Sequence, residues 1–268
     1  MTDPEAKSRD ALGVLPMARR SLLLGIAAST LAATTAHGQG QPLPPGYEHI
    51  TLWPKRPPGE RGPLPADTVM PRRPGAGPED IAYARVGEPA LIALRPARPN
   101  GAALTLVPGG GYQRLAVGHE GYAIATRFAA LGYWCFILLY RLPGAPWTAG
   151  TLAPMQDAQR ALRLIRSLAP GCGYSASRVG TVGFSAGGHL AGWLATRGEA
   201  TYAPRDAVDS EPLRLAFAAL LYPVVTMEGP AAHPAIALSA SLTMPTNNGL
   251  PPSPIGFSVN SSSAPIVA

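Results

Sequence analysis

The chain has 268 residues, of which 46% are hydrophobic and 14% are charged, and this composition supplies one globular core of ordinary size. Its formal net charge of +6 comes mostly from scattered arginines. The sequence has no run of basic residues interleaved with aromatic ones, the pattern that would predict a nucleic-acid surface. The prolines and glycines follow no triplet period, which excludes a collagen-like fibre. The two cysteines, Cys135 and Cys172, are too few for a disulfide scaffold and lack metal-ligand spacing.

The N-terminal region has the pattern of an export signal. Arg19 and Arg20 precede an apolar stretch at 21–33, and small residues suited to cleavage follow it. The stretch is too short to span a bilayer, so no stable membrane insertion is expected after cleavage. The paired arginines resemble a twin-arginine signal, which predicts a signal peptide over residues 1–38 and a periplasmic or secreted protein.

The elements expected after this signal alternate between strand and helix. Residues 39–80 are crowded with Pro, Gly and Arg, and an irregular strap is expected there, with regular structure starting near Ile81. Strands are predicted at 89–96, 102–108, 133–140, 178–184 and 215–225, and helices at 122–131, 155–169 and 186–196. Short apolar runs alternating with helices predict an α/β core over 81–228, a three-layer sandwich with a mostly parallel sheet. The helix predicted at 155–169 has one apolar face, and three arginines lie outside it: Arg160, Arg163 and Arg166.

The candidate nucleophile is Ser185, in the sequence GFSAG at 183–187. This sequence fits the G-x-S-x-G pattern, with a predicted strand before it and a predicted helix after it. A serine at such a sharp turn needs a strained backbone, and side chains two residues to either side would collide, which favours Gly183 and Gly187.

A second glycine-rich loop, PGGGY at 108–112, directly follows the strand predicted at 102–108. Glycines let backbone N–H groups approach a ligand oxygen closely, so Gly110 and Gly111 are the expected oxyanion donors on this side. The N–H of Ala186 is the expected donor on the other side. Neither phosphate-binding glycine pattern can be aligned with this loop.

Together these motifs resemble the α/β-hydrolase superfamily, and within it secreted bacterial esterases of the acetylxylan-esterase-like and hormone-sensitive-lipase-like kind. The matching pieces are LWP (52–54), VPGGGY (107–112), HEG (119–121), YRL (140–142), PMQDAQRALRLIR (154–166), GFSAGGHLA (183–191) and YPV (222–224). The resemblance implies hydrolysis of carboxylic esters, such as acetyl groups on plant polysaccharide. It also implies a Ser-Asp-His triad that needs no metal and no organic cofactor.

The acid and the histidine of that triad, which should follow the serine, are not found. Residues 229–268 contain no Asp, Glu, Lys or Arg, and their only histidine is His233. An irregular, uncharged tail is therefore expected, of the kind left by a shifted reading frame or a premature end, with the last strands of the sheet missing. The strand at 215–225 would then be a sheet edge that invites self-association.

Two other histidines, His119 and His233, are weak candidates for the base. His189 lies one helical turn beyond Ser185, so a hydrogen-bonded core position is expected for it. Asp157 and Asp209 are expected to be structural, Asp157 near a helix start where the helix dipole favours a carboxylate.

Three functions remain open from the sequence. The first is a serine esterase whose activity is doubtful because the acid and base are missing. The second is a non-catalytic relative that binds carbohydrate or ester through the remaining pocket. The third is a peptidase or amidase of the same fold.

Overall fold

The computed structural model describes residues 42–60, 62–77, 80–143 and 147–224. The predicted signal peptide at 1–38 and the predicted uncharged tail at 229–268 lie outside these residues. The strands of the described part are β1 (Tyr47–Thr51), β2 (Thr68–Pro71), β3 (Ile81–Arg85), β4 (Ala90–Leu94), β5 (Ala103–Val107), β6 (Trp134–Leu139), β7 (Val179–Phe184) and β8 (Ala218–Leu221). Its helices are α1 (Ala123–Ala130), α2 (Ala153–Cys172) and α3 (Ala186–Thr196), with shorter turns η1 (Val117–Tyr122), η2 (Gly150–Leu152), η3 (Ala176–Arg178) and η4 (Ala207–Ser210).

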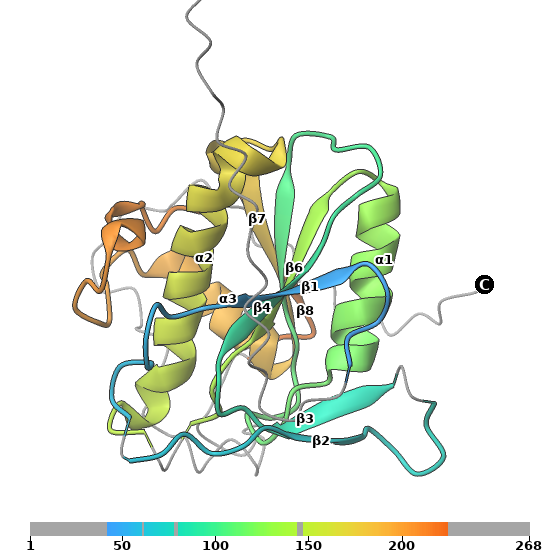
Figure 1. Ribbon diagram of the computed structural model, residues 1–268, viewed down its shortest axis with the longest axis vertical. Coiled ribbons are helices and arrows are strands. Elements are labelled where there is room, and N and C mark those ends of the chain that lie inside the picture. The colour runs from blue at the N-terminus through green and yellow to red at the C-terminus, as the bar shows by residue number, and fades with distance from the viewer. Residues whose placement is uncertain (1–41, 61, 78–79, 144–146, 225–268) are drawn as a thin grey trace, which may run out of the picture. The chain divides into compact units, whose positions relative to one another are not determined.

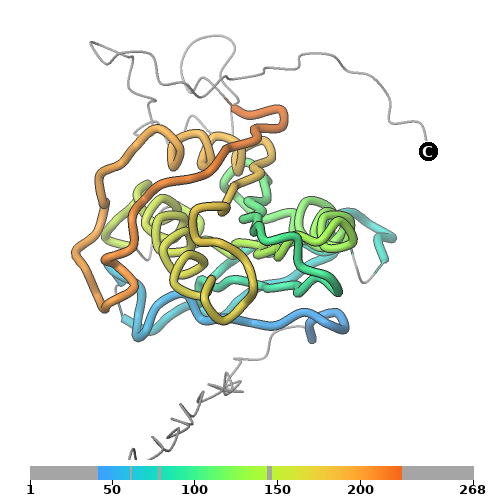
Figure 2. Tube along the Cα trace, turned by 90° about the horizontal axis from the view of Figure 1, so that it is seen from above, coloured from blue at the N-terminus to red at the C-terminus, as the bar shows by residue number. Residues whose placement is uncertain are grey.

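Six strands form one mixed sheet in the order β1-β4-β6-β5-β7-β8 (Figure 1). The pairs β6–β5, β5–β7 and β7–β8 are parallel, whereas β1–β4 and β4–β6 are antiparallel. Figure 2 shows the blue N-terminal strand at one edge of this sheet and the red end of the described chain at the other. The predicted α/β architecture with a mostly parallel sheet is therefore confirmed, and its antiparallel part lies on the N-terminal side.

Helices cover both faces of the sheet. Helix α1 packs against β6 and β4 on one face, and α2 and α3 pack together against β5 and β7 on the other (Figure 1). Every residue of β5, β6 and β7 is buried, as their apolar sequences require for strands between two helix layers. Helix α2 continues past Pro170 and ends at Cys172, three residues beyond its predicted end at 169. The next residue, Gly173, has a φ of 76°, which is typical of the glycine that ends a helix. Among the described residues, no helix is long and apolar enough to cross a membrane.

The prediction of an irregular strap at 39–80 was wrong at two places. Strand β1 pairs along its whole length with β4 and forms one edge of the main sheet. Strand β2 pairs with β3 in a separate two-stranded sheet, from Thr68 to Pro71. Both strands are short and partly exposed, so their sequences lack the long apolar runs by which the central strands were recognised.

Strand β8 is shorter than predicted. The predicted strand spans 215–225, but β8 covers only Ala218–Leu221, and its side chains are half-buried or exposed. Its outer edge has no paired strand within the described part of the chain, as expected for a strand at the edge of the sheet.

A buried ion pair connects three of the motifs quoted above. Arg141 and Asp157 are both 0% exposed, and the guanidinium Nη2 lies 2.9 Å from the carboxylate Oδ1. The same carboxylate accepts a hydrogen bond from the indole N–H of Trp53 at 2.8 Å and another from the Arg141 backbone N–H at 2.8 Å. Asp157 is therefore structural, as predicted, but arginine and indole donors hold it instead of the start of a helix.

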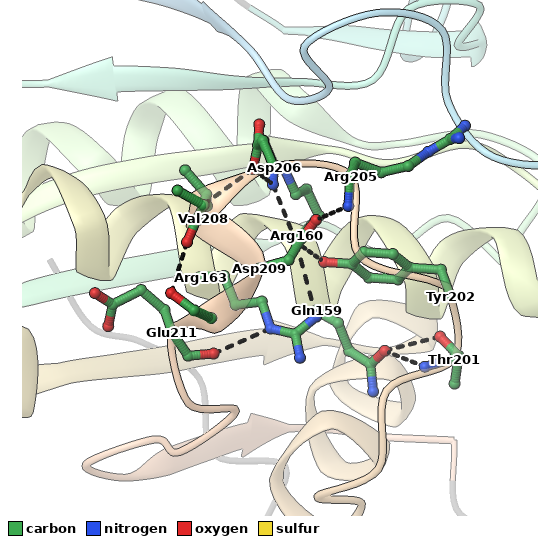
Figure 3. Close-up of polar contacts among 12 residues, drawn as sticks. Gln159, Arg160, Arg163, Thr201, Tyr202, Arg205, Asp206, Val208, Asp209 and Glu211 are labelled. Carbon is green, nitrogen blue, oxygen red and sulfur yellow. Dashed lines mark hydrogen bonds and ion pairs between the residues drawn. The ribbon is translucent and has the colours of Figure 1, made fainter.

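A second polar network attaches the segment 199–211 to helix α2 (Figure 3). Arg160 forms a bidentate ion pair with Asp206, with its Nη1 and Nη2 lying 2.6 and 2.7 Å from the two carboxylate oxygens. Its Nη1 also lies 3.0 Å from the Asp209 Oδ1. Asp209 accepts a 2.6 Å hydrogen bond from the Tyr202 hydroxyl. Arg160 and Arg163, which lie off the apolar stripe of the helix, are buried beneath this segment. Asp209 is thus structural, as predicted.

Candidate active site

Ser185 occupies the turn between β7 and α3 with a φ of 51° and a ψ of −117°. A positive φ is strained for a residue with a side chain, and the neighbouring backbone holds it. The Ser185 N–H donates to the Leu221 carbonyl at 3.0 Å, and the Ser185 carbonyl accepts from His189 N–H at 3.0 Å and Val224 N–H at 3.3 Å. The strained turn predicted from the G-x-S-x-G pattern is confirmed. Ser185 is half-buried, and within the described chain its hydroxyl has no hydrogen-bond partner.

The two glycines flanking the serine are sterically necessary. A Cβ on Gly183 would collide with the Gly187 carbonyl and lie 2.7 Å from the Ala191 Cβ. A Cβ on Gly187 would collide with the Val107 carbonyl and lie 2.6 Å from the Pro108 carbonyl oxygen. The predicted collision two residues to either side of Ser185 is therefore confirmed, and it involves the PGGGY loop as well as helix α3.

The PGGGY loop leaves β5 beside Ser185. A Cβ on Gly109 would lie 3.0 Å from the Ser185 Cβ, so this glycine permits the close approach of loop and serine. The next three residues have positive φ, 132° at Gly110, 65° at Gly111 and 57° at Tyr112. No acceptor for the Gly110 or Gly111 N–H is found among the residues that the structure describes. Two unpaired backbone donors thus occupy the loop next to the serine, and Ala186 begins the helix opposite.

Two buried tyrosine hydroxyl groups form hydrogen bonds that hold this loop in place. The Tyr112 hydroxyl lies 2.8 Å from Nδ1 of His189, which is 1% exposed. The Tyr140 hydroxyl donates to the Pro108 carbonyl at 2.8 Å. Burial raises the pKa of Tyr112 and of Tyr140, so both hydroxyls keep their protons at neutral pH. His189 is a hydrogen-bonded core residue, as predicted.

A hollow of about 690 Å³ opens next to the same loop. Tyr112 and Gln113 line one part of it, and Arg85, Leu142 and Trp147 line other parts. The Trp147 ring is backed by the guanidinium carbon of Arg141 at 5.0 Å from the ring centroid, which ties this wall to the buried ion pair. The volume lies in the range of small-molecule sites.

The profile of the BD-FAE family matches residues 97–217, a segment that contains the PGGGY loop, the turn at Ser185 and the Arg141–Asp157 ion pair. This match agrees with the α/β architecture described above and with the superfamily that the motifs resemble.

Proteins of known function and structure are also similar to this chain. An acetylxylan esterase of Xylanibacter ruminicola is 32% identical over 147 residues, which are 55% of this chain and 28% of that protein. Endo-1,4-beta-xylanase B of Butyrivibrio fibrisolvens is 34% identical over 92 residues, 34% of this chain and 14% of that protein. An acetyl ester-xyloside bifunctional hydrolase from Caldicellulosiruptor lactoaceticus has a similar structure, with a TM-score of 0.53 and 27% identity, covering 80% of this chain and 68% of that one. The chain thus spans less than a third of the length of the two proteins matched by sequence.

Of the two weak candidates for the base, His119 alone lies within the described residues. His119 is exposed on η1 and has no hydrogen-bond partner within the described residues. His233 lies outside the described residues. The structure thus places Ser185 beside Gly109 and the loop donors, but it places no histidine within hydrogen-bonding distance of the hydroxyl in the part that it describes.

Three residues that contact the site are not predicted by the sequence motifs. Gly109 lies against Ser185, whereas the expected donors are Gly110 and Gly111. Glu120 is buried against Gly109, and Tyr222 is bonded to Glu120. The available signal was the HEG motif at 119–121, in which an acidic residue stands between apolar and small residues close to the loop in sequence.

Proposed function

We propose that this chain is a serine hydrolase of carboxylic esters, with Ser185 as the nucleophile. The observation that carries the proposal is the Ser185 backbone, strained at a φ of 51° between β7 and α3, with the half-buried serine lying against the glycine loop that contains the unpaired N–H groups. Strain of this kind persists where surrounding structure enforces it, and it is concentrated at functional sites. The match of residues 97–217 to the BD-FAE family supports the same reaction class.

In the proposed reaction the Ser185 Oγ attacks the ester carbonyl carbon, and the carbonyl oxygen becomes an anion. The N–H groups of Gly110, Gly111 and Ala186 are the proposed donors to this anion, and the N-terminus of α3 adds its positive dipole end. Collapse of the tetrahedral intermediate expels the alcohol and leaves an acyl-serine, which water hydrolyses. The serine proton needs an acceptor, for which His119 and His233 remain the candidates in this chain.

The proposed substrates are acetyl esters of a xylan-type polysaccharide. An acetylxylan esterase and an acetyl ester-xyloside hydrolase are among the proteins to which the chain is similar, which supports this choice. The hollow lined by Tyr112, Gln113 and Trp147 adjoins the proposed oxyanion loop and is the proposed position of the sugar. Export by a twin-arginine signal at 1–38, which would bring the protein to such a substrate, is likewise proposed from Arg19 and Arg20.

Labelling with a fluorophosphonate tests the nucleophile, because only an activated serine reacts with this probe. The full chain should be phosphonylated at Ser185, and Ser185→Ala should remove the label without loss of folded structure. Ser177→Ala is the matched control on an exposed serine and should label like the wild type. Hydrolysis of p-nitrophenyl acetate should follow the same pattern.

A folded wild-type chain that takes up no label would contradict the proposal and favour the non-catalytic binding function. A serine without a base retains only about 10³–10⁴-fold acceleration over water, so slow hydrolysis with weak labelling would mean that the base is missing. Cleavage of an acyl anilide faster than the matching ester would favour the amidase alternative.

A further inference from the structure

Glu120 is a buried carboxylate that the proposed reaction does not use. It is 9% exposed and lies in η1, a π-helical turn, a conformation that is rare and frequent at functional sites. Its Oε2 accepts the Gly109 N–H at 2.6 Å, and its Oε1 accepts the Tyr222 hydroxyl at 2.9 Å. Within the described residues Glu120 forms no salt bridge, and its two hydrogen-bond donors are both neutral groups. Retaining a buried carboxylate without a cation is costly unless it is fully hydrogen-bonded.

The two donors belong to the two segments that flank Ser185. Gly109 opens the PGGGY loop, and a Cβ there would lie 3.0 Å from the Ser185 Cβ and 3.2 Å from the Glu120 Oε2. Tyr222 follows Leu221, whose carbonyl accepts the Ser185 N–H at 3.0 Å. The carboxylate therefore joins the loop on one side of the serine to the segment after β8 on the other.

The Tyr222 end of this connection is also strained. Tyr222 has a φ of 37°, unusual for a residue with a large side chain, and the residue is 61% exposed. Burial of the hydroxyl and its hydrogen bond to Glu120 raise the pKa of Tyr222, so it remains a donor at neutral pH. A largely exposed residue whose backbone is strained and whose hydroxyl is bonded to Glu120 indicates that this hydrogen bond holds the residue in place.

We propose that Glu120 is a positioning residue that fixes the PGGGY loop against Ser185 by holding the Gly109 N–H and the Tyr222 hydroxyl at once. This inference rests on the proposed function, in which the N–H groups that follow Gly109 receive the anion. Glu120 exchanges no proton and touches no substrate. It keeps the loop donors aimed at the oxygen before the substrate arrives, the condition under which such donors are effective.

Four variants of the full chain separate this role from a general structural one. Glu120→Ala removes both contacts, and Tyr222→Phe removes one. Glu120→Gln keeps a carbonyl oxygen that accepts the Gly109 N–H. Its amide NH₂ can donate a hydrogen bond to the oxygen of the Tyr222 hydroxyl. Glu88→Ala deletes an exposed carboxylate elsewhere and is the matched control.

Two measurements are made on each variant. The first is hydrogen exchange of a peptide covering 107–113, with a peptide of α3 as the reference for folding. The second is the rate of fluorophosphonate labelling at Ser185. Glu120→Ala should exchange about tenfold faster in the loop alone, and it should label about 100-fold more slowly. Tyr222→Phe should fall between it and the wild type, and Glu120→Gln and Glu88→Ala should stay close to the wild type in both.

Unchanged loop exchange in Glu120→Ala would overturn the proposal, as would faster exchange with wild-type labelling. Slow labelling in Glu120→Gln with intact loop protection would overturn the positional role in favour of the charge itself. If the wild type takes up no label, the nucleophile assignment fails, and loop exchange in Glu120→Ala still decides whether the carboxylate holds the loop.

Discussion

Single atoms decide whether the turn at Ser185 can form. The hydrogen of Gly187 faces the Val107 and Pro108 carbonyl oxygens, which belong to the end of β5 and the start of the PGGGY loop. A methyl group in its place would push the loop away from the serine. The same position therefore controls both the packing of α3 on the sheet and the distance between the serine and the proposed oxyanion donors.

Gly187→Ala should lower the free energy of unfolding by about 1–3 kcal/mol, because a methyl group must displace main-chain atoms that cannot rotate away. Fluorophosphonate labelling of Ser185 should slow in the same variant. Urea unfolding monitored by circular dichroism gives the free energy. Gly198→Ala is the control, since a Cβ there meets nothing within 4 Å, and its unfolding should change little. Equal unfolding of the two variants would refute the steric argument.

Residue patterns predicted the glycines of the G-x-S-x-G turn because the collision involves residues close in sequence. The roles of Gly109 and Glu120 were not predicted. Both depend on the fold of η1 back over the loop, which places Glu120 against Gly109 across 11 positions of sequence. A glycine in a run of three gives no sign of which member touches the serine.

At the scale of elements, helix α2 shows what apolar periodicity can predict. The apolar stripe of α2 predicted which helix face packs on the sheet, and it left Arg160 and Arg163 outside that face. Both arginines are nevertheless buried, because the segment 199–211 lies over them and supplies Asp206, Asp209 and a backbone carbonyl of Glu211 (Figure 3). The periodicity of one helix carries no information about which distant segment covers its other face.

The ion pair of Asp206 predicts a dependence of stability on pH. Hydrogen bonds from Arg160 hold the pKa of Asp206 below its ordinary value. A carboxyl whose pKa is lower in the folded chain stabilises the fold above its unfolded pKa of about 3.9, and this stabilisation is lost as the pH falls through the folded pKa. Asp206→Asn should therefore be less stable than the wild type at pH 7, and the difference should shrink below about pH 4.

Urea unfolding at a series of pH values measures this difference. Glu88→Gln, which neutralises an exposed carboxylate, is the control and should follow the wild type at each pH. A difference between Asp206→Asn and the wild type that stays constant down to the lowest pH would rule out the ion pair as its cause.

The pKa of Asp209 is also lowered. Burial opposes this shift, but hydrogen bonds from the Tyr202 hydroxyl, the Arg205 N–H and Arg160 outweigh it.

At the scale of the whole molecule, the described part of the sheet has β1 at one edge and β8 at the other. Three large apolar side chains are exposed along or next to β8: Phe217 is 43% exposed, Leu221 37% and Tyr222 61%. An edge strand that presents unpaired backbone groups beside apolar side chains is a template for pairing with another chain. An edge is expected here from the sequence, and within the described residues β8 is one.

The purified chain should therefore self-associate, and size-exclusion chromatography at increasing concentration should show a growing fraction above the monomer mass. Leu221→Lys should reduce that fraction, because a charge on an edge strand opposes pairing. Leu131→Lys is the control, since Leu131 is 67% exposed but lies after α1, away from the sheet edge. A monomer at all concentrations, or an equal effect of both variants, would count against pairing through β8.

The sequence by itself determined the alternation of strands and helices from β4 to α3, the serine turn and its two flanking glycines. These depend on apolar periodicity and on collisions within a few residues, both of which are written locally in the chain. Only the tertiary structure decided that β1 completes the sheet, that α2 carries buried arginines, and that Glu120 joins the two segments beside Ser185. Each of these is a contact between segments far apart in sequence, whose energy depends on burial and on donors and acceptors that the fold brings together.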